Sequence, residues 1–112
     1  IPAEASAYPE NVSKEDCKAI LEGYLANYDA ADDNSQWFDK VRSMGESLGY
    51  AGKPKDYKKN PDQFKGHVGD VSAVIRLAVT GRTNSPDLCP VMQVLGQEEM
   101  ERRVREAMEI LK

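Results

Sequence analysis

The stretch that decides the fold is HVGDVSAVIRLAVTGRTNSPDL, residues 67–88. Five apolar residues in its first half recur at the spacing of one helix face: Val71, Val74, Ile75, Ala78 and Val79. This spacing predicts a helix over about residues 67–80 that is buried on that face. On a helical wheel, Arg76 and Thr80 project to the opposite side.

The second half, GRTNSPDL at residues 81–88, predicts a connector rich in polar groups. Gly81 tolerates a positive φ and ends the helix, while Pro86 stiffens the turn. Asp87 is a candidate N-cap for a short helix that starts near Leu88, because Pro90 is tolerated only in the first turn of a helix. The residues between Gly81 and Pro86 offer a guanidinium, two hydroxyls and an amide, so the connector is also a candidate binding loop.

Similar signals predict three further helices. Ser13 stands three residues before Asp16, and Asp33 stands three residues before Gln36, which is capping-box spacing at the start of two helices. Gly49 is a candidate for ending the second of them. A last helix over residues 97–111, QEEMERRVREAMEIL, has acidic groups in its first turn and basic groups after them, as the helix dipole favours.

Residues 51–66, AGKPKDYKKNPDQFKG, predict a long structured loop rather than a helix, because they contain five lysines, two prolines and two glycines. No stretch alternates cleanly as a strand does. The fold class predicted is therefore all-α, with about five helices in a compact, bundle-like domain and one long basic loop. We expect residues 13–112 to form this domain and residues 1–12 to be a linker or arm to an upstream domain.

The composition is that of a soluble globular protein, with 40% hydrophobic and 30% charged residues in 112. The net charge of −4 argues against a strongly basic nucleic-acid binder, yet residues 40–82 hold nine basic and four acidic groups. A phosphate backbone would be tolerated there. No apolar run approaches the ~20 residues of a membrane span. We expect a cytoplasmic piece of a longer protein, whose Cys17 and Cys89 are reduced.

Catalytic and metal-binding patterns are absent from the sequence. His67 is the only histidine and has no nucleophile or metal ligand beside it in sequence. The cluster Asp29, Asp32 and Asp33 lacks the spacing of a calcium loop, so a solvated helix end is the simpler interpretation. We therefore expect this chain to be no enzyme and to carry no cofactor or metal of its own.

Three segments together resemble the C-terminal end of bacterial glutamyl-tRNA synthetases: WFDKVRSMGESLGYA at 37–51, KDYKKNPDQFKGHVGDVSAVIRLAVTGRTNSPDL at 55–88 and VMQVLGQEEMERRV at 91–104. The most specific part is residues 74–96, where R-x-A-x-T-G precedes a short polar loop, S-P-x-L and a helix ending in L-G. In this family that region is an all-helical anticodon-binding domain. The resemblance implies that a catalytic domain using ATP and Mg²⁺ lies upstream in the parent glutamate–tRNA ligase.

The resemblance also implies which residues contact RNA. Four match positions that contact the second and third anticodon bases: Arg76, Ser85, Pro86 and Leu88. An Arg fork, a hydroxyl and backbone amides are groups that read the edges of unstacked bases, and Leu88 would pack on a base face. Three more are undecided between phosphate contact and solvent exposure: Arg82, Thr83 and Asn84. Lys58 and Lys59 are electrostatic candidates for the backbone of the anticodon stem.

The partners implied are a glutamate tRNA and the upstream catalytic domain, with neither membrane nor DNA. The residues leave open whether glutamine tRNA is also accepted. An alternative is a helical protein-interaction domain that shares the fold and binds no RNA, because each basic residue taken singly is also typical of a solvated surface.

Overall fold

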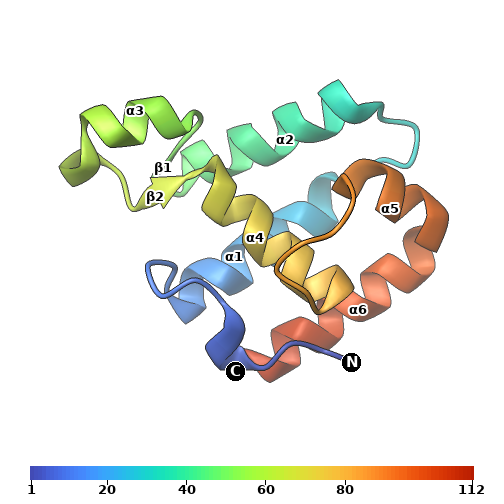
Figure 1. Cartoon of the computed structure of the whole chain (residues 1–112). Coiled ribbons are helices and arrows are strands. Elements are labelled where there is room, and N and C mark those ends of the chain that lie inside the picture. The colour runs from blue at the N-terminus through green and yellow to red at the C-terminus, as the bar shows by residue number, and fades with distance from the viewer.

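The computed structural model describes all residues, from Ile1 to Lys112. Six α-helices, two 3₁₀ turns (η) and two short strands follow along the chain (Figure 1): η1 Ala5–Ala7, α1 Lys14–Asn27, α2 Asn34–Ser47, β1 Tyr50–Ala51, α3 Pro54–Lys59, η2 Pro61–Gln63, β2 Gly66–His67, α4 Val68–Thr80, α5 Leu88–Leu95 and α6 Gln97–Ile110. The predicted all-α class is confirmed. No helix combines the length and the apolar character needed to cross a membrane.

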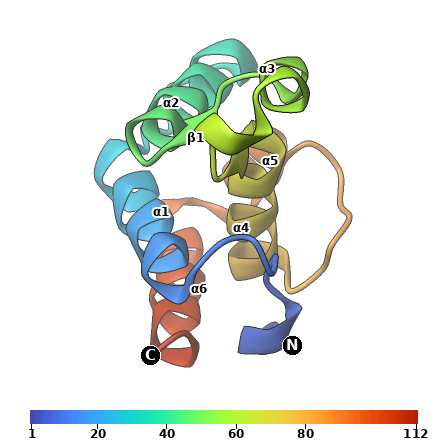
Figure 2. The same cartoon turned by 90° about the vertical axis from the view of Figure 1, so that its left-hand side faces the viewer.

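Helix α4 is the centre of the domain and packs against α1, α2 and α6 (Figure 2). The side chains of Val71, Val74 and Ile75 are fully buried there, as the apolar spacing predicts. Leu77 is buried as well, while Ala78 is only half-buried. One hydrophobic core joins the helices, so α4 fixes the positions of the loop after it and of helices α5 and α6.

The helix starts are fixed by their capping residues. At α2, the Asp33 carboxylate accepts a hydrogen bond from the Gln36 N–H at 2.9 Å, and the Gln36 side chain accepts one from the Asp33 N–H at 3.0 Å, which confirms the predicted capping box. At α1, Ser13 caps Asp16, but the Asp16 carboxylate does not return the bond. It instead accepts from the Tyr50 hydroxyl at 2.8 Å.

The sole histidine caps α4. His67 Nδ1 accepts a hydrogen bond from the Gly69 N–H at 2.9 Å, and the Asp70 carboxylate accepts one from the His67 N–H, also at 2.9 Å. A ring nitrogen that accepts an N–H bond is unprotonated, so the neutral imidazole serves as the cap. His67 therefore has a structural task in the place where the sequence predicts an ordinary surface or loop histidine.

The prediction of a long structured loop over residues 51–66 is wrong in excluding a helix. This segment contains the short helix α3, which begins at Pro54, a residue favoured at the first helical position. Strands β1 and β2 flank it and pair in parallel, with Tyr50 opposite Gly66. Tyr57 of α3 packs on His67 at 5.8 Å between ring centroids, so α3 is held against the start of α4.

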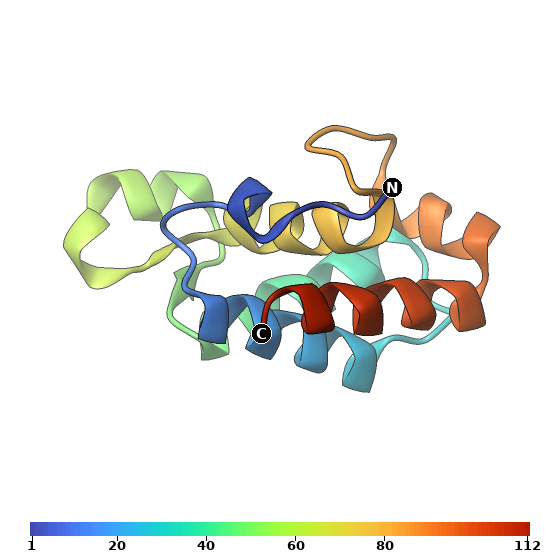
Figure 3. The ribbon, with the colours of Figure 1, turned by 90° about the horizontal axis from the view of Figure 1, so that it is seen from below.

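The N-terminal arm, residues 1–12, lies against the helical body. Tyr8 and Val12 are buried in the common core, and the arm runs along α4 (Figure 3). A Cβ on Gly81 would clash with the Ile1 carbonyl oxygen, so only glycine fits there. Whether the arm also joins an upstream domain, as the sequence predicts, stays a prediction.

Candidate nucleic-acid interface

The loop between α4 and α5, residues 81–87, stands out from the helical body (Figures 2 and 3). Gly81 adopts the left-handed conformation with φ 72° and ψ 11°, and its N–H donates to the Leu77 carbonyl at 2.9 Å, which ends α4. The Thr80 hydroxyl accepts from the Arg82 N–H at 3.1 Å and so fixes the first step of the loop. These two bonds fix the backbone at the point where the loop leaves α4.

Arg76 and Ser85 are in direct contact, although nine residues separate them. The Arg76 Nε–H donates to Ser85 Oγ at 2.9 Å, and the Ser85 hydroxyl donates to the Pro86 carbonyl oxygen at 2.8 Å. These two bonds fasten the end of the loop to the polar side of α4. The terminal nitrogens of the guanidinium have no partner in the protein, so the forked end of Arg76 is free to donate to a ligand.

Arg82, Thr83 and Asn84 form the exposed crest of the loop. Their side chains make no hydrogen bond or ion pair within the chain. The Arg82 guanidinium therefore makes no contact with the C-terminal end of α4, and all three side chains are free to meet a partner from solvent.

An open pocket of about 310 Å³ is lined in part by Arg76. This volume is at the lower end of the ~300–1,000 Å³ range of ligand pockets. Its lining comes from the first turns of α2, from α4 and from the start of α5: Asn34, Trp37, Phe38, Ser72, Arg76, Asp87, Leu88 and Cys89. The pocket thus joins residues 34–38 of α2 to residues of α4 and α5 that come more than 30 positions later in the sequence.

Leu88 and Asp87 occupy different parts of this pocket. The Leu88 side chain is 3% exposed and belongs to the hydrophobic core, so it forms part of the pocket wall rather than projecting toward solvent. Asp87 stands at the N-cap position of α5, as predicted, but its exposed carboxylate makes no capping hydrogen bond. The expected capping role of the Asp87 side chain is therefore wrong, although the helix does begin at Leu88.

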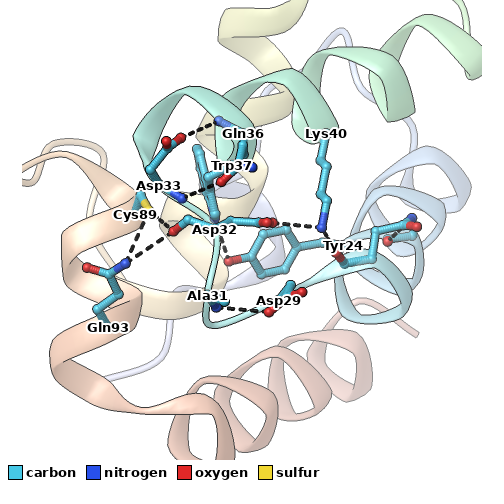
Figure 4. A network of polar contacts seen from close by, with 12 residues as sticks. Tyr24, Asp29, Ala31, Asp32, Asp33, Gln36, Trp37, Lys40, Cys89 and Gln93 are labelled. Carbon is cyan, nitrogen blue, oxygen red and sulfur yellow. Dashed lines mark hydrogen bonds and ion pairs between the residues drawn. The ribbon is translucent and has the colours of Figure 1, made fainter.

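A polar network behind the pocket holds the α1–α2 turn against α5 (Figure 4). The Asp32 carbonyl accepts hydrogen bonds from Gln93 Nε2 at 3.3 Å and from the Cys89 thiol at 3.8 Å. The Asp32 carboxylate lies 2.7 Å from Lys40 Nζ on α2. These contacts tie α2 to α5 and so hold the two walls of the pocket in place.

Cys89 and Trp37 of this network, and Cys17 in the first turn of α1, have structural roles. Trp37 Nε1–H donates to the Tyr24 hydroxyl at 3.0 Å, and the Trp37 side chain is buried in the core. Burial first, and then the neighbouring Asp32 and Asp33, raise the pKa of the Cys89 thiol. Burial likewise raises the pKa of Cys17 to about 11. Both cysteines are free thiols in the protonated form and are poor nucleophiles.

The lysines predicted to contact RNA lie at the other end of α4. Lys58 and Lys59 are exposed on α3, which projects from the domain beside the start of α4 (Figures 1 and 3). The 13 residues of α4 span roughly 20 Å at 1.5 Å per residue. The predicted residues therefore form two groups, one around the pocket and loop and one on α3.

The residues of α2 that line the pocket could not be predicted from the sequence. The buried residues of α2 are Trp37, Val41 and Gly45, while Phe38 is half-buried and lines the pocket. Asn34 has no sequence signal beyond its place after the capping residue Asp33. Only the packing of α2 against α4 brings these residues beside Arg76.

Comparison with known proteins places these features in a wider context. A family model described as an anticodon binding domain matches residues 57–108. The chain is 54% identical over 98 residues, 88% of its length, to a glutamate–tRNA ligase of Acetivibrio thermocellus, and 46% identical over 101 residues, 90% of its length, to one of Sorangium cellulosum. It is 40% identical over 96 residues, 86% of its length, to one of Clostridium perfringens. The chain spans about 18% of the length of each of these relatives. No solved structure matches it.

Proposed function

On these matches the chain belongs to the family of glutamate–tRNA ligase anticodon-binding domains, and we propose that it reads the anticodon loop of a glutamate tRNA. In this proposal it is the C-terminal domain of a longer cytoplasmic enzyme. That enzyme attaches glutamate to its tRNA with ATP and Mg²⁺, bound in a catalytic domain upstream in the same chain.

The observation that carries the proposal is the free fork of Arg76 at the pocket. Its Nε–H is committed to Ser85, so the guanidinium is aimed while its terminal nitrogens stay available. A base in an RNA loop is unstacked and presents its Watson–Crick edge to such donors. The pocket between α2 and α5 then receives the flat ring, and buried Leu88 forms part of its wall.

Ser85 and Pro86 prepare the loop for binding. The Ser85 hydroxyl proton is directed to the Pro86 carbonyl, and one of its lone pairs is taken by Arg76. Pro86 restricts the backbone in the same turn, so less conformational entropy is lost when RNA binds. We assign Ser85 to positioning Arg76. The exposed Arg82, Thr83 and Asn84 meet the phosphates and sugars of the anticodon loop.

Helix α3 provides a second contact with the RNA. Lys58 and Lys59 lie on α3 beside the start of α4, whereas the loop follows the other end of this helix, which is roughly 20 Å long. In this proposal the two lysines meet phosphates of the anticodon stem. Lysines on a projecting helix neutralise phosphates without reading bases. This contact supplies affinity, while the pocket supplies selectivity.

The experiment that tests the proposal is a fluorescence anisotropy titration at low salt. The chain is titrated into a labelled glutamate anticodon stem-loop and into the same stem carrying a scrambled anticodon. We expect tighter binding to the glutamate anticodon, and weaker binding of both as salt rises, because phosphate contacts release counterions. Equal affinity for the two RNAs would refute base reading. An absence of binding to either would favour a protein-interaction domain.

A further inference from the structure

A second hollow lies where the N-terminal arm, the end of α4 and helix α6 meet. It has a volume of about 270 Å³ and shares no residue with the pocket around Arg76. Its lining comes from residues 1–3 and Tyr8 of the arm, from residues 77–81, and from the stretch of α6 between Arg102 and Ile110. We call it the arm groove.

The arm groove gathers apolar side chains that are open to solvent. The domain exposes three large apolar residues, and two of them, Ile1 and Ile110, line this groove. The third, Val94, lies on α5 outside it. Apolar side chains that gather at one exposed place are typical of a surface that another segment covers.

The charged residues around the groove already have partners within the chain. Arg102 lies 2.8 Å from Glu99 and 3.1 Å from Glu106, and Arg103 lies 2.8 Å from Glu99. The Arg103 Nη1–H also donates to the Val79 carbonyl at 2.9 Å. An ionic ligand such as phosphate would have to compete with these contacts, so the groove favours an occupant that brings apolar side chains.

The start of the arm lies at this groove. Its first carbonyl oxygen, that of Ile1, is packed against Gly81 at the end of α4 (Figure 3). Ile1 precedes Pro2, and the residue before a proline is disfavoured in helical backbone. In the proposed parent enzyme more of the chain precedes Ile1, and this domain corresponds to about 18% of the length of the related ligases. Upstream residues would therefore reach the groove as an extended segment.

We infer that the extended segment of the parent chain immediately before Ile1 packs into the arm groove, with an apolar side chain against Ile110. This inference rests on the proposed function, which places a further domain upstream. Tyr8 in the groove is 7% exposed, and burial raises the pKa of its hydroxyl to about 12. Gly81 contacts Ile1 and also begins the loop 81–87, so a docked segment would hold that loop in a fixed place relative to the upstream domain.

The first test measures side-chain exposure in the full-length enzyme by hydroxyl-radical footprinting. The unaltered enzyme is compared with a variant in which about ten residues before Ile1 are replaced by a flexible Gly-Ser linker of equal length. We expect radical labelling of Ile110 to rise several-fold in the linker variant. Labelling of Val94, which lies outside the groove, should stay the same.

The second test removes the apolar contact from the side of the groove. Ile110→Ser and the matched control Val94→Ser are made in the full-length enzyme, and cleavage before Ile1 by a nonspecific protease is timed. Cleavage should be about 10-fold faster for Ile110→Ser, the factor expected for the loss of one buried apolar side chain, and unchanged for Val94→Ser. Met100, which is fully buried, should resist oxidation in both variants if the domain stays folded. If Ile110→Ser unfolds the domain, the linker variant decides.

Equal labelling of Ile110 in the unaltered enzyme and the linker variant would overturn the inference. If Ile110 is instead protected in both enzymes and dilution removes that protection, a second copy covers the groove and the inference is wrong. Both tests are made without RNA, so their failure leaves anticodon discrimination by Arg76 untouched. Conversely, protection of Ile110 in an enzyme that binds all anticodons equally would support the docked segment and refute the proposed function.

Discussion

Replacing Ser85 by alanine tests whether this hydroxyl acts by holding Arg76. The substitution removes the 2.9 Å bond from Arg76 Nε and the 2.8 Å bond to the Pro86 carbonyl. The guanidinium then regains rotamers that must be frozen again when RNA binds. Ordering one such side chain costs about 0.5–1.5 kcal/mol. We therefore expect the affinity for the glutamate stem-loop to fall about 2- to 12-fold.

The assay is a double-mutant cycle measured by anisotropy. Ser85→Ala, Arg76→Ala and the double variant are titrated with the same RNA, and Ser43→Ala, an exposed serine of α2 without a hydrogen bond, is the control. If Ser85 acts only through Arg76, its loss should have little effect once Arg76 is absent. The reasoning is refuted if the two losses add within about 0.5 kcal/mol, because Ser85 would then contact the RNA by itself.

Three further predictions concern the rest of the domain. Lys58→Ala should weaken binding of every anticodon alike and reduce the slope of log K against log salt by about 1, and an unchanged slope would exclude α3 from the RNA surface. Lys40→Met should lower the free energy of unfolding in urea by about 1–2 kcal/mol, because it leaves the Asp32 carboxylate, which is 11% exposed, without its cation. Lys40 is itself 41% exposed, so this loss is smaller than for a fully buried ion pair. Adding Asp32→Asn should recover most of that loss, and no recovery would contradict the ion-pair account. Finally, the free energy of unfolding should fall as pH rises above 9. The pKa of Cys17 is about 11 in the folded state against an ordinary value of 9.0, so the folded protein keeps this proton at a pH where the unfolded chain releases it. Constant stability from about pH 8 to 10.5 would contradict this prediction.

The helices could be predicted because their signals are local. Asp33 and Gln36 are three residues apart, and the capping box that their spacing predicts is present. The apolar spacing of α4 likewise reports a face that is buried in the fold. Helix α3 could not be predicted in the same way. Its six residues are rich in lysine, and tertiary contacts such as that of Tyr57 with His67 hold it in place.

The candidate site was predicted only on the α4 side. The resemblance in residues 74–96 pointed to Arg76 and Ser85, and the structure places their side chains in contact. The pocket itself depends on Phe38, almost 40 residues earlier, which α2 brings to α4 through packing in the core. No sequence spacing encodes that approach. The free carboxylate of Asp87 was hidden because its position is that of an ordinary N-cap.

The most direct test of the central claim is the anticodon discrimination of Arg76→Ala. The ratio of dissociation constants for scrambled and glutamate anticodon stem-loops is measured for the unaltered chain, for Arg76→Ala and for Arg105→Ala, an exposed arginine of α6 with an ordinary helix-surface ion pair. We predict that the ratio falls close to 1 for Arg76→Ala and is kept by Arg105→Ala. A ratio that Arg76→Ala leaves unchanged would contradict the claim that the free fork of Arg76 reads the anticodon.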